Sequence, residues 1–262
     1  MEPHRISSAK NIVLKRFRRL ARENEPGLFL IEGRHVLEEA LRVEWPLREV
    51  LLEENLWDQW RDSLALHASE GKVYLAPKNL VEQVSRTASP EGVLASGERK
   101  PAGWPGAQAG DLWLYLDAVQ DPANVGMLVR SATAFGLAGV FCGEGTADPF
   151  HPTALSRSAG AAFHLQILPC SLGLFLKWAE DKKVLLMAAN ARGEPFHLRP
   201  RPQGPAVLAL GNEGRGLSAP LLEACHIRLA IPMLHGWDSL NVAVAGSLIL
   251  FALSPYSRPQ PQ

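Results

Sequence analysis

Three short segments combine glycine with polar side chains in patterns that could do chemistry. Each follows an apolar run, and they comprise residues 121–126 (DPANVG), 209–218 (ALGNEGRGLS) and 231–247 (IPMLHGWDSLNVAVAGS). Amides and hydroxyls can hold and orient a substrate hydroxyl, and an arginine can stabilise developing negative charge on oxygen. The side chains that could serve in this way are Asn124, Arg130, Glu213, Ser239 and Asn241.

Each of these residues also has a plainer interpretation when it is taken alone. Asn124 could cap a helix, and Glu213 could be an exposed residue in a tight glycine turn. Ser239 and Asn241 precede an apolar helix, but capping explains one of them more easily than both. Arg130 lies on the side of its helix opposite the apolar residues, where an arginine is usually solvated.

Composition narrows the class of protein. The chain has 262 residues, 47% of them hydrophobic, and a formal net charge of zero, so it can bury the core of one large or two modest domains. The 3 cysteines are far apart, and no HExxH or Cys/His cluster occurs. We therefore expect a metal-free protein in a reducing compartment, the cytoplasm. Because no long apolar run or secretory signal is present, membrane insertion and secretion are not expected.

The first 24 residues are strongly basic, although the whole chain is neutral. They carry two acidic residues, Glu2 and Glu23, against seven basic ones: Arg5, Lys10, Lys15, Arg16, Arg18, Arg19 and Arg22. This asymmetry suggests contact with a polyanion. A solvated face of an amphipathic helix and an organelle transit peptide are the alternatives.

The remaining chain alternates apolar strand-like runs with helix-like stretches, which is typical of an α/β fold. A Gly- and Pro-rich stretch, GERKPAGWPGAQAG, separates two such series. We expect a domain of residues 1–98, a linker of residues 99–110, a second domain of residues 111–256, and a polar tail of residues 257–262. The second series predicts a mostly parallel sheet with helices on both faces, and a Pro/Arg-rich loop after VLLMAAN.

The three polar segments together, in this order, resemble the motifs of the SpoU (TrmH-like) RNA ribose 2′-O-methyltransferases. FLIEGRHVLEEAL and GVLA resemble the N-terminal substrate-binding domain of that family, which is similar to a ribosomal-protein fold. The resemblance covers the chain beyond the basic first helix, and that helix is similar to the leader of the ribosomal-RNA branch. It implies S-adenosylmethionine as the methyl donor, a SPOUT-type trefoil knot in the C-terminal domain, and a homodimer formed through that domain.

The resemblance also implies roles for individual residues. Cofactor contacts fall on Gly211, Ile231 and Leu240, whose main-chain groups would hold the donor. Catalytic positions fall on the five polar residues named first. Substrate RNA is expected at the basic helix and the first domain, through Arg16, Arg18, Arg19 and Arg34.

The chemistry of methyl transfer to a ribose hydroxyl favours one division of labour among these residues. Family proposals make the motif-one arginine, here Arg130, the base, but a guanidinium is a poor proton acceptor at neutral pH. We expect Arg130 to clamp RNA phosphate and stabilise the alkoxide. Glu213, Ser239 or Asn241 would then orient the hydroxyl or relay its proton.

The motifs leave the substrate open between large-subunit ribosomal RNA, which the leader and first domain favour, and transfer RNA. Two other classes remain as alternatives: a non-catalytic RNA-binding protein with a vestigial donor pocket, and a nucleotide-processing enzyme that uses the glycine-rich loop for phosphate. The intact polar residues argue against the first, and the absence of a P-loop lysine argues against the second.

Overall fold

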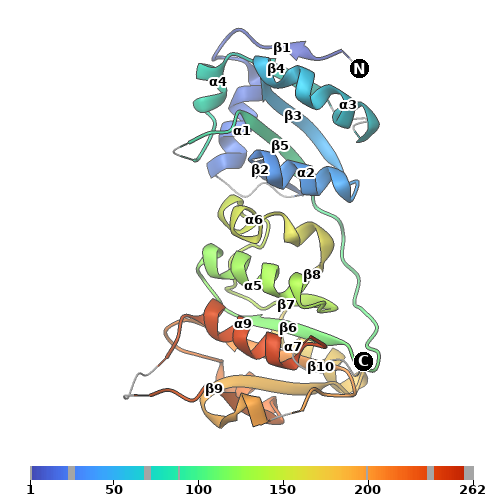
Figure 1. Ribbon diagram of the computed structural model, residues 1–262, viewed down its shortest axis with the longest axis vertical. Coiled ribbons are helices and arrows are strands. Elements are labelled where there is room, and N and C mark those ends of the chain that lie inside the picture. Colours follow the sequence, from blue (N-terminus) through green and yellow to red (C-terminus); the bar gives the residue numbers. More distant parts are fainter. Residues whose placement is uncertain are drawn as a thin grey trace. The chain divides into compact units, whose positions relative to one another are not determined.

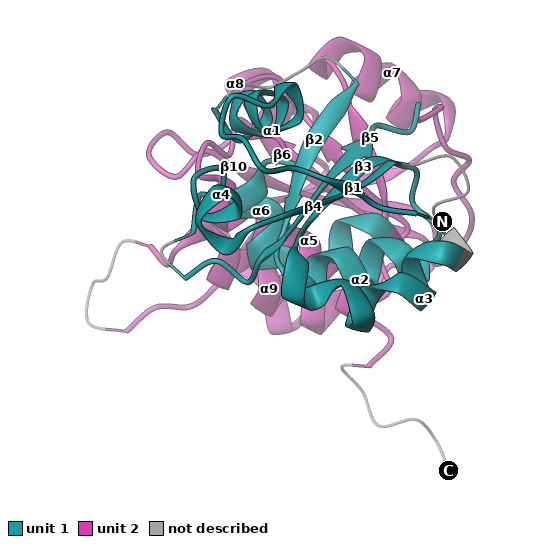
Figure 2. Ribbon diagram, turned by 90° about the horizontal axis from the view of Figure 1, so that it is seen from above, with its two compact units in different colours: residues 1–101, 150–163 teal, residues 102–149, 164–262 magenta. Residues whose placement is uncertain are grey.

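The computed structural model of the protein describes residues 2–22, 27–67, 72–87, 89–198, 200–234 and 239–256. The chain forms two compact units (Figure 2). Residues 1–101 and 150–163 make up unit 1, and residues 102–149 and 164–262 make up unit 2. The expected tail, residues 257–262, lies outside the described residues.

Unit 1 is built on a five-stranded mixed sheet with the strand order β1-β4-β3-β5-β2. Its elements are β1 (His4–Arg5), α1 (Ile12–Arg22), β2 (Leu28–Glu32), α2 (Arg34–Arg42), β3 (Leu47–Glu53), η1 (Glu54–Leu56), α3 (Trp57–His67), β4 (Lys72–Ala76), α4 (Lys78–Glu82), β5 (Val93–Glu98) and α6 (Pro152–Ser158). The 3-10 helix η2 (Ala161–His164) follows α6. The sequence expectation of a small α/β first domain agrees with this sheet.

Helix α1 packs on the sheet of unit 1 through its apolar stripe, which includes Leu14 and Phe17, both fully buried. On its polar side, Arg16 Nη2 donates to Glu49 Oε1 at 2.7 Å, and the Glu49 side chain is only 6% exposed. The Tyr74 hydroxyl donates to the same oxygen at 3.5 Å. Burial and the Glu49 charge raise the pKa of Tyr74. Arg16 therefore has a structural role in holding α1 on β3.

Because Glu49 is buried, replacing Arg16 by glutamine is expected to lower the free energy of unfolding by about 3 kcal/mol, since a buried carboxylate would lose its charged partner. Urea denaturation of the wild type and the variant measures this loss. Lys15 lies on the same helix with an exposed side chain, so Lys15→Gln serves as the control and should leave stability within about 0.5 kcal/mol. Equal stability of Arg16→Gln and wild type would show that the pair does not hold the helix.

The segment of residues 150–163 belongs to unit 1 because of an aromatic cluster. The rings of Phe29 and Phe150 lie 4.8 Å apart, and those of Trp45 and Phe163 lie 5.1 Å apart. Sequence analysis placed this segment inside residues 111–256, whereas the structure groups it with residues 1–101. The reason is long-range packing of rings that no local pattern of the segment contains.

Unit 2 is a six-stranded sheet in which every pair of strands is parallel, with the order β11-β9-β10-β6-β7-β8. Its elements are β6 (Leu112–Asp117), α5 (Pro122–Ala134), β7 (Gly139–Cys142), β8 (Gln166–Pro169), α7 (Leu172–Asp181), β9 (Leu185–Pro195), η3 (Phe196–Leu198), β10 (Ala206–Gly211), α8 (Ala219–Ala224), β11 (Ile227–Ala230) and α9 (Val242–Leu253). The predicted parallel sheet is confirmed. The trefoil knot stays a prediction.

Both faces of this sheet are covered, as the apolar strands require. Trp113 and Tyr115 on β6 pack with Phe175 and Trp178 of α7. On the other face α9 lies against α5 and β10 (Figure 1). A Cβ added to Gly246 would lie 2.5 Å from side-chain atoms of Leu128 and Leu210, so a glycine lets α9 approach closely.

Strand β9 is longer than expected, because the sequence predicted a Pro/Arg-rich loop after VLLMAAN. The strand instead continues to Pro195 and pairs with β11 through Glu194 and Pro195. The pairing could not be predicted locally, because Gly193 and Pro195 are typical of loops and because the partner strand comes more than 30 residues later. Among the described residues, no helix is long and apolar enough to cross a membrane.

Candidate active site

The three polar segments meet at the carboxyl ends of β6 and β10, which lie side by side at the centre of the sheet of unit 2. From β6 the chain passes through α5 to β7 on one side, while β10 is followed by α8 and β11 on the other. Open parallel sheets bind ligands at such a point of divergence. The fold therefore places the candidate residues where a site is expected.

A chain of hydrogen bonds joins the three segments. Asn241 Nδ2 donates to Asn124 Oδ1 at 2.9 Å, and Asn124 Nδ2 donates to Glu213 Oε1 at 2.9 Å. Asn241 Oδ1 accepts from the backbone N–H groups of Ala243 and Val244 at the start of α9. These acceptances fix the orientation of the Asn241 amide, so the direction of the whole chain of bonds is set by the backbone of α9.

Asn124 is not the helix cap that the plain interpretation suggests. Asp121 caps α5, with its carboxylate accepting from Ala123 N at 2.8 Å. Asn124 lies in the first turn and is 4% exposed. A buried amide needs hydrogen-bond partners, and here they come from the other two segments. Asn241 does cap α9, whereas Ser239 is exposed.

Glu213 is held by N–H groups. Its carboxylate accepts from Gln120 N at 3.3 Å, from Asp121 N at 3.4 Å and from Asn124. Partial burial acts to raise the pKa of Glu213, but the hydrogen bonds from Asn124 and the backbone outweigh it, so the pKa is lowered. Glu213 is therefore ionised at neutral pH and is a poor proton acceptor.

The lowered pKa of Glu213 gives a pH dependence of stability. A carboxylate whose pKa is lower in the folded than in the unfolded state stabilises the fold above its ordinary value of 4.5, and this contribution is lost as the pH falls through the folded value. Urea midpoints measured from pH 6 to pH 3 should therefore fall less steeply for Glu213→Gln than for wild type. Parallel curves would contradict the assignment.

The loop of residues 211–217 folds back on itself. Asn212 and Gly216 exchange two backbone hydrogen bonds of 3.0 and 2.9 Å, and Gly216 has a φ of +71°. A Cβ on Gly211 would lie 2.2 Å from the backbone of Gly216 and Leu217. A glycine is therefore required at position 211 by the fold of the loop itself.

A cavity of about 750 Å³ opens beside these segments and has the size of a cofactor site. The predicted donor contacts Gly211, Ile231 and Leu240 all line it, as do Glu213, Ser239 and Asn241. Apolar walls and a glycine loop that brings backbone close to the cavity suit an adenosine and a methionine chain. The residues therefore fit S-adenosylmethionine.

Arg130 and Asn124 are not part of the cavity lining. Arg130 is exposed on α5, while Val125, Leu128, Val129 and Ala132 of the same helix are buried, so the predicted orientation of this helix is confirmed. Arg130 lies six positions after Asn124, about 9 Å along a helix. Arg130 is thus available to a substrate outside the cavity.

Sequence reasoning missed several residues of the cavity wall, among them Asn190, Arg192, Arg228 and Met233. Asn190 ends the expected strand VLLMAAN, and Arg192 lies on the unexpected extension of β9. The sequence signal for the extended strand would be side chains that alternate in polarity with a period of two residues, but Gly193 and Pro195 interrupt this alternation. In the described part of the chain, no group of three or more His, Cys, Asp or Glu residues could hold a metal ion.

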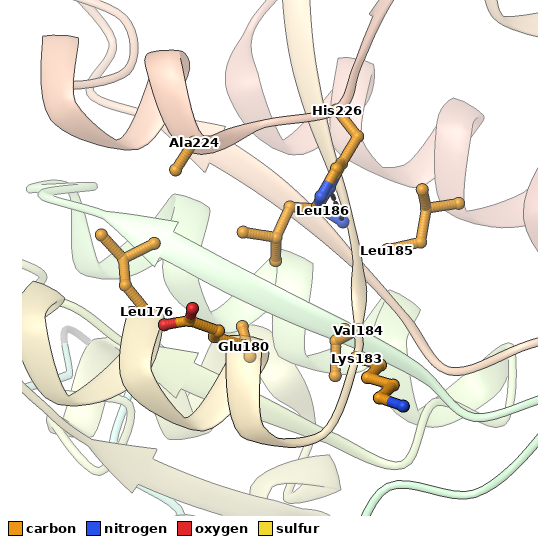
Figure 3. Close-up of a pocket in the computed structure, with 9 residues that line it drawn as sticks. Leu176, Glu180, Lys183, Val184, Leu185, Leu186, Ala224 and His226 are labelled. Carbon is orange, nitrogen blue, oxygen red and sulfur yellow. Dashed lines mark hydrogen bonds between the residues drawn. The ribbon is translucent and has the colours of Figure 1, made fainter.

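A second cavity, of about 540 Å³, lies between α7, the start of β9 and the end of α8 (Figure 3). Leu176, Leu186 and Ala224 form much of its wall, with His226 beside them. His226 Nδ1 accepts from Leu186 N at 3.0 Å, which ties this histidine to β9. This cavity contains none of the predicted site residues.

Comparison with known proteins agrees with the site. Residues 111–251 match the SpoU rRNA Methylase family, and residues 5–95 match the MRM3-like substrate binding domain. This chain belongs to the SpoU rRNA methylase family. The resemblance found in the three motifs and in the first domain is thereby confirmed.

Individual members of the family are similar over nearly the whole chain. A 23S rRNA guanosine 2′-O-methyltransferase of Bacillus subtilis, RlmP, is 33% identical over 256 residues, covering 95% of this chain and 98% of that protein. A 23S rRNA uridine 2′-O-methyltransferase of Streptomyces viridochromogenes is 26% identical over 86% of this chain and 82% of its own length. The AdoMet-bound rRNA methyltransferase of Sinorhizobium meliloti superposes with a TM-score of 0.86, at 25% identity, over 95% of this chain and 96% of that one.

Proposed function

We propose that this protein transfers a methyl group from S-adenosylmethionine to a ribose 2′-hydroxyl in large-subunit ribosomal RNA. The observation that carries the proposal is the chain of hydrogen bonds from Asn241 through Asn124 to Glu213, beside a cavity lined by Gly211, Ile231 and Leu240. The names of the relatives from Bacillus subtilis and Streptomyces viridochromogenes support 23S rRNA as the substrate class. These two relatives act on the riboses of different nucleosides, a guanosine and a uridine, so the proposal names no base.

When bound, the donor supplies an electrophilic methyl group on a sulfonium. The walls formed around Gly211, Ile231 and Leu240 hold it and keep water away, and orientation of two reactants can contribute roughly 7 to 11 kcal/mol to lowering a barrier. Glu213 stays ionised and places a fixed negative charge in the cavity lining. This charge favours a cationic ligand over an anionic one.

The hydrogen bonds favour one residue as the contact to the ribose hydroxyl. The oxygens of Glu213 accept three N–H groups, and the amide of Asn241 is used in capping α9 and in binding Asn124. Ser239 is exposed in the cavity lining, and its hydroxyl can orient the nucleophile. We assign to Arg130 the clamping of RNA phosphate and the stabilisation of the alkoxide, with the proton passing to solvent.

The two expected domains would divide the task. Residues 1–98 would bind RNA shape and backbone through Arg18, Arg19 and Arg34, and residues 111–256 would carry the methyl transfer, joined by the linker of residues 99–110. Arg16 is omitted because it is paired with Glu49. We place the enzyme in the cytoplasm, where ribosomal RNA is modified.

We propose a homodimer formed through α5 and α9. Both helices expose large apolar side chains, with Met127 37%, Val244 49%, Leu248 44% and Phe251 47% exposed. Val244, Leu248 and Phe251 are spaced by four and three residues, so they share one face of α9. Arg130 follows Met127 by three residues and would lie at the edge of the interface.

The dimer has a direct test. Leu248→Glu places a charge on the exposed apolar face and should convert the protein to a monomer in analytical ultracentrifugation. The thermal midpoint of a dimer depends on protein concentration, and this dependence should disappear in the variant. Leu174 is 56% exposed on α7, and Leu174→Glu is the matched control that should leave the dimer intact. A monomeric wild type, or a dimeric Leu248→Glu, would contradict the proposal.

The function is tested by incubating the protein with S-adenosylmethionine and unmodified 23S rRNA, and with transfer RNA separately. Methyl transfer to ribosomal RNA is the expected result. Transfer to transfer RNA alone would replace the substrate class. Absence of both transfer and S-adenosylhomocysteine binding would favour a non-catalytic RNA-binding protein.

A further inference from the structure

Strand β9 contains a large bulge beside the donor cavity. In the pairing with β11, Ala188 is opposite Arg228, but the next pair is Glu194 with Leu229. Residues 189–193 therefore have no partner on β11. A Cβ on Gly193 would lie 2.4 Å from the carbonyl oxygen of Arg228, so the glycine lets the bulged strand return against β11. Bulges of this kind are common next to active sites, where they redirect side chains.

The bulge brings arginines to the rim of the cavity. Arg192, on the bulge, and Arg228, at the position where it begins, line the cavity together with Arg215 from the glycine-rich loop. All three are exposed. Among the described residues, none of the three is in an ion pair. The rim therefore presents three guanidinium groups that a ligand can reach.

The charge of this cavity does not match the donor alone. Among the described residues that line the cavity, Glu213 is the one carboxylate, and N–H groups already hold it. S-adenosylmethionine carries a sulfonium, an ammonium and one carboxylate, so three arginines exceed what it needs. Several guanidinium groups at an exposed rim suit a ligand with several anionic oxygens, because the planar fork of arginine binds phosphate through two hydrogen bonds.

We propose that Arg192, Arg215 and Arg228 bind phosphate groups of the RNA strand next to the target ribose. This inference rests on the proposed function, since it assumes that an RNA strand enters beside the donor cavity. Every ribose in a chain is flanked by phosphates, so these contacts hold the strand in place for any base. They would add an RNA-binding surface on unit 2 to the basic surface of unit 1.

The test uses the full-length protein with Arg192→Gln, Arg215→Gln and Arg228→Gln made singly. Lys177→Gln is the matched control, because Lys177 is an exposed cation of unit 2 on α7 that does not line either cavity. Affinity for an unmodified 23S rRNA fragment is measured over a range of salt concentrations, and affinity for S-adenosylhomocysteine is measured by calorimetry.

Each arginine variant is expected to weaken RNA binding by about 3- to 10-fold and to reduce the slope of log K against log salt by about 1. S-adenosylhomocysteine affinity should stay within about twofold of wild type, and lysine at the same position should restore the salt dependence but only part of the RNA affinity. Lower S-adenosylhomocysteine affinity with unchanged RNA affinity would assign the arginines to the donor carboxylate instead. RNA binding equal to that of Lys177→Gln would also overturn the proposal.

These readouts separate the inference from the proposed function. RNA affinity and its salt dependence do not require methyl transfer. A wild type that transfers no methyl group while the three variants still lose RNA affinity would contradict the function and leave the phosphate contacts supported.

Discussion

Arg130→Lys is expected to lower the rate of methyl transfer by about 100- to 1000-fold, in the range seen when a donor to a developing oxyanion is removed. Arg130 is exposed on α5 while the apolar stripe of that helix is buried, so its guanidinium is accessible to a substrate. Lysine keeps the charge but lacks the planar fork that grips phosphate through two bonds. Single-turnover rates measured with saturating donor and RNA test this loss.

The control for this prediction is Arg157→Lys, on α6 of unit 1, which is also exposed and should keep the wild-type rate. S-adenosylhomocysteine affinity of Arg130→Lys should equal that of wild type, because Arg130 does not line the donor cavity. If Arg130→Lys retained most of the rate with full RNA affinity, the phosphate clamp would be wrong.

Asn124→Asp is the second substitution with a large expected effect, a loss of about 100-fold in activity at pH 8. It would place a second carboxylate 2.9 Å from an oxygen of Glu213 and present an acceptor in place of the amide donor. Two carboxylates at that distance cannot both ionise without a penalty, so the pKa of one of them is raised. The three segments would then separate.

The pH dependence distinguishes this explanation from a general loss of structure. Below the raised pKa one carboxyl is protonated and can donate again, so the deficit in stability should be small near pH 4 and should grow as the pH rises. Urea midpoints at several pH values measure it. Asn190→Asp is the control, since Asn190 lines the cavity but accepts from Arg192 N through an oxygen that aspartate keeps. A deficit that does not change with pH would exclude carboxylate repulsion as its cause.

The sequence was sufficient to predict the parts of the site that depend on local pattern. The apolar spacing in α5 predicted which side of the helix Arg130 lies on. Because Asn124, Glu213 and Asn241 each follow an apolar strand, their position at one end of a parallel sheet could also be predicted. The order of the three motifs then indicated the family, and the match of residues 111–251 to the SpoU rRNA Methylase family confirms it. That the three side chains form one directed chain of hydrogen bonds could not be predicted, because its two bonds join residues that are 89 and 117 positions apart in the sequence.

Other features depend on long-range packing and were therefore missed. Arg16 was expected to contact RNA, but its guanidinium donates a hydrogen bond to Glu49, which comes 33 residues later. From the sequence, Phe150 and Phe163 belong to the second domain. In the structure their rings pack against Phe29 and Trp45 of the first. The bulge of residues 189–193 needs Gly193 against Arg228, a pair that no local periodicity contains.

The central claim is tested most directly by transferring a labelled methyl group from S-adenosylmethionine to unmodified 23S rRNA and digesting the product with alkali. Alkaline cleavage uses the 2′-hydroxyl, so a 2′-O-methyl protects the neighbouring phosphodiester. We predict that the label is recovered in alkali-resistant dinucleotides, and that Arg130→Lys nearly abolishes it. Label in mononucleotides would show methylation of a base and would contradict the account.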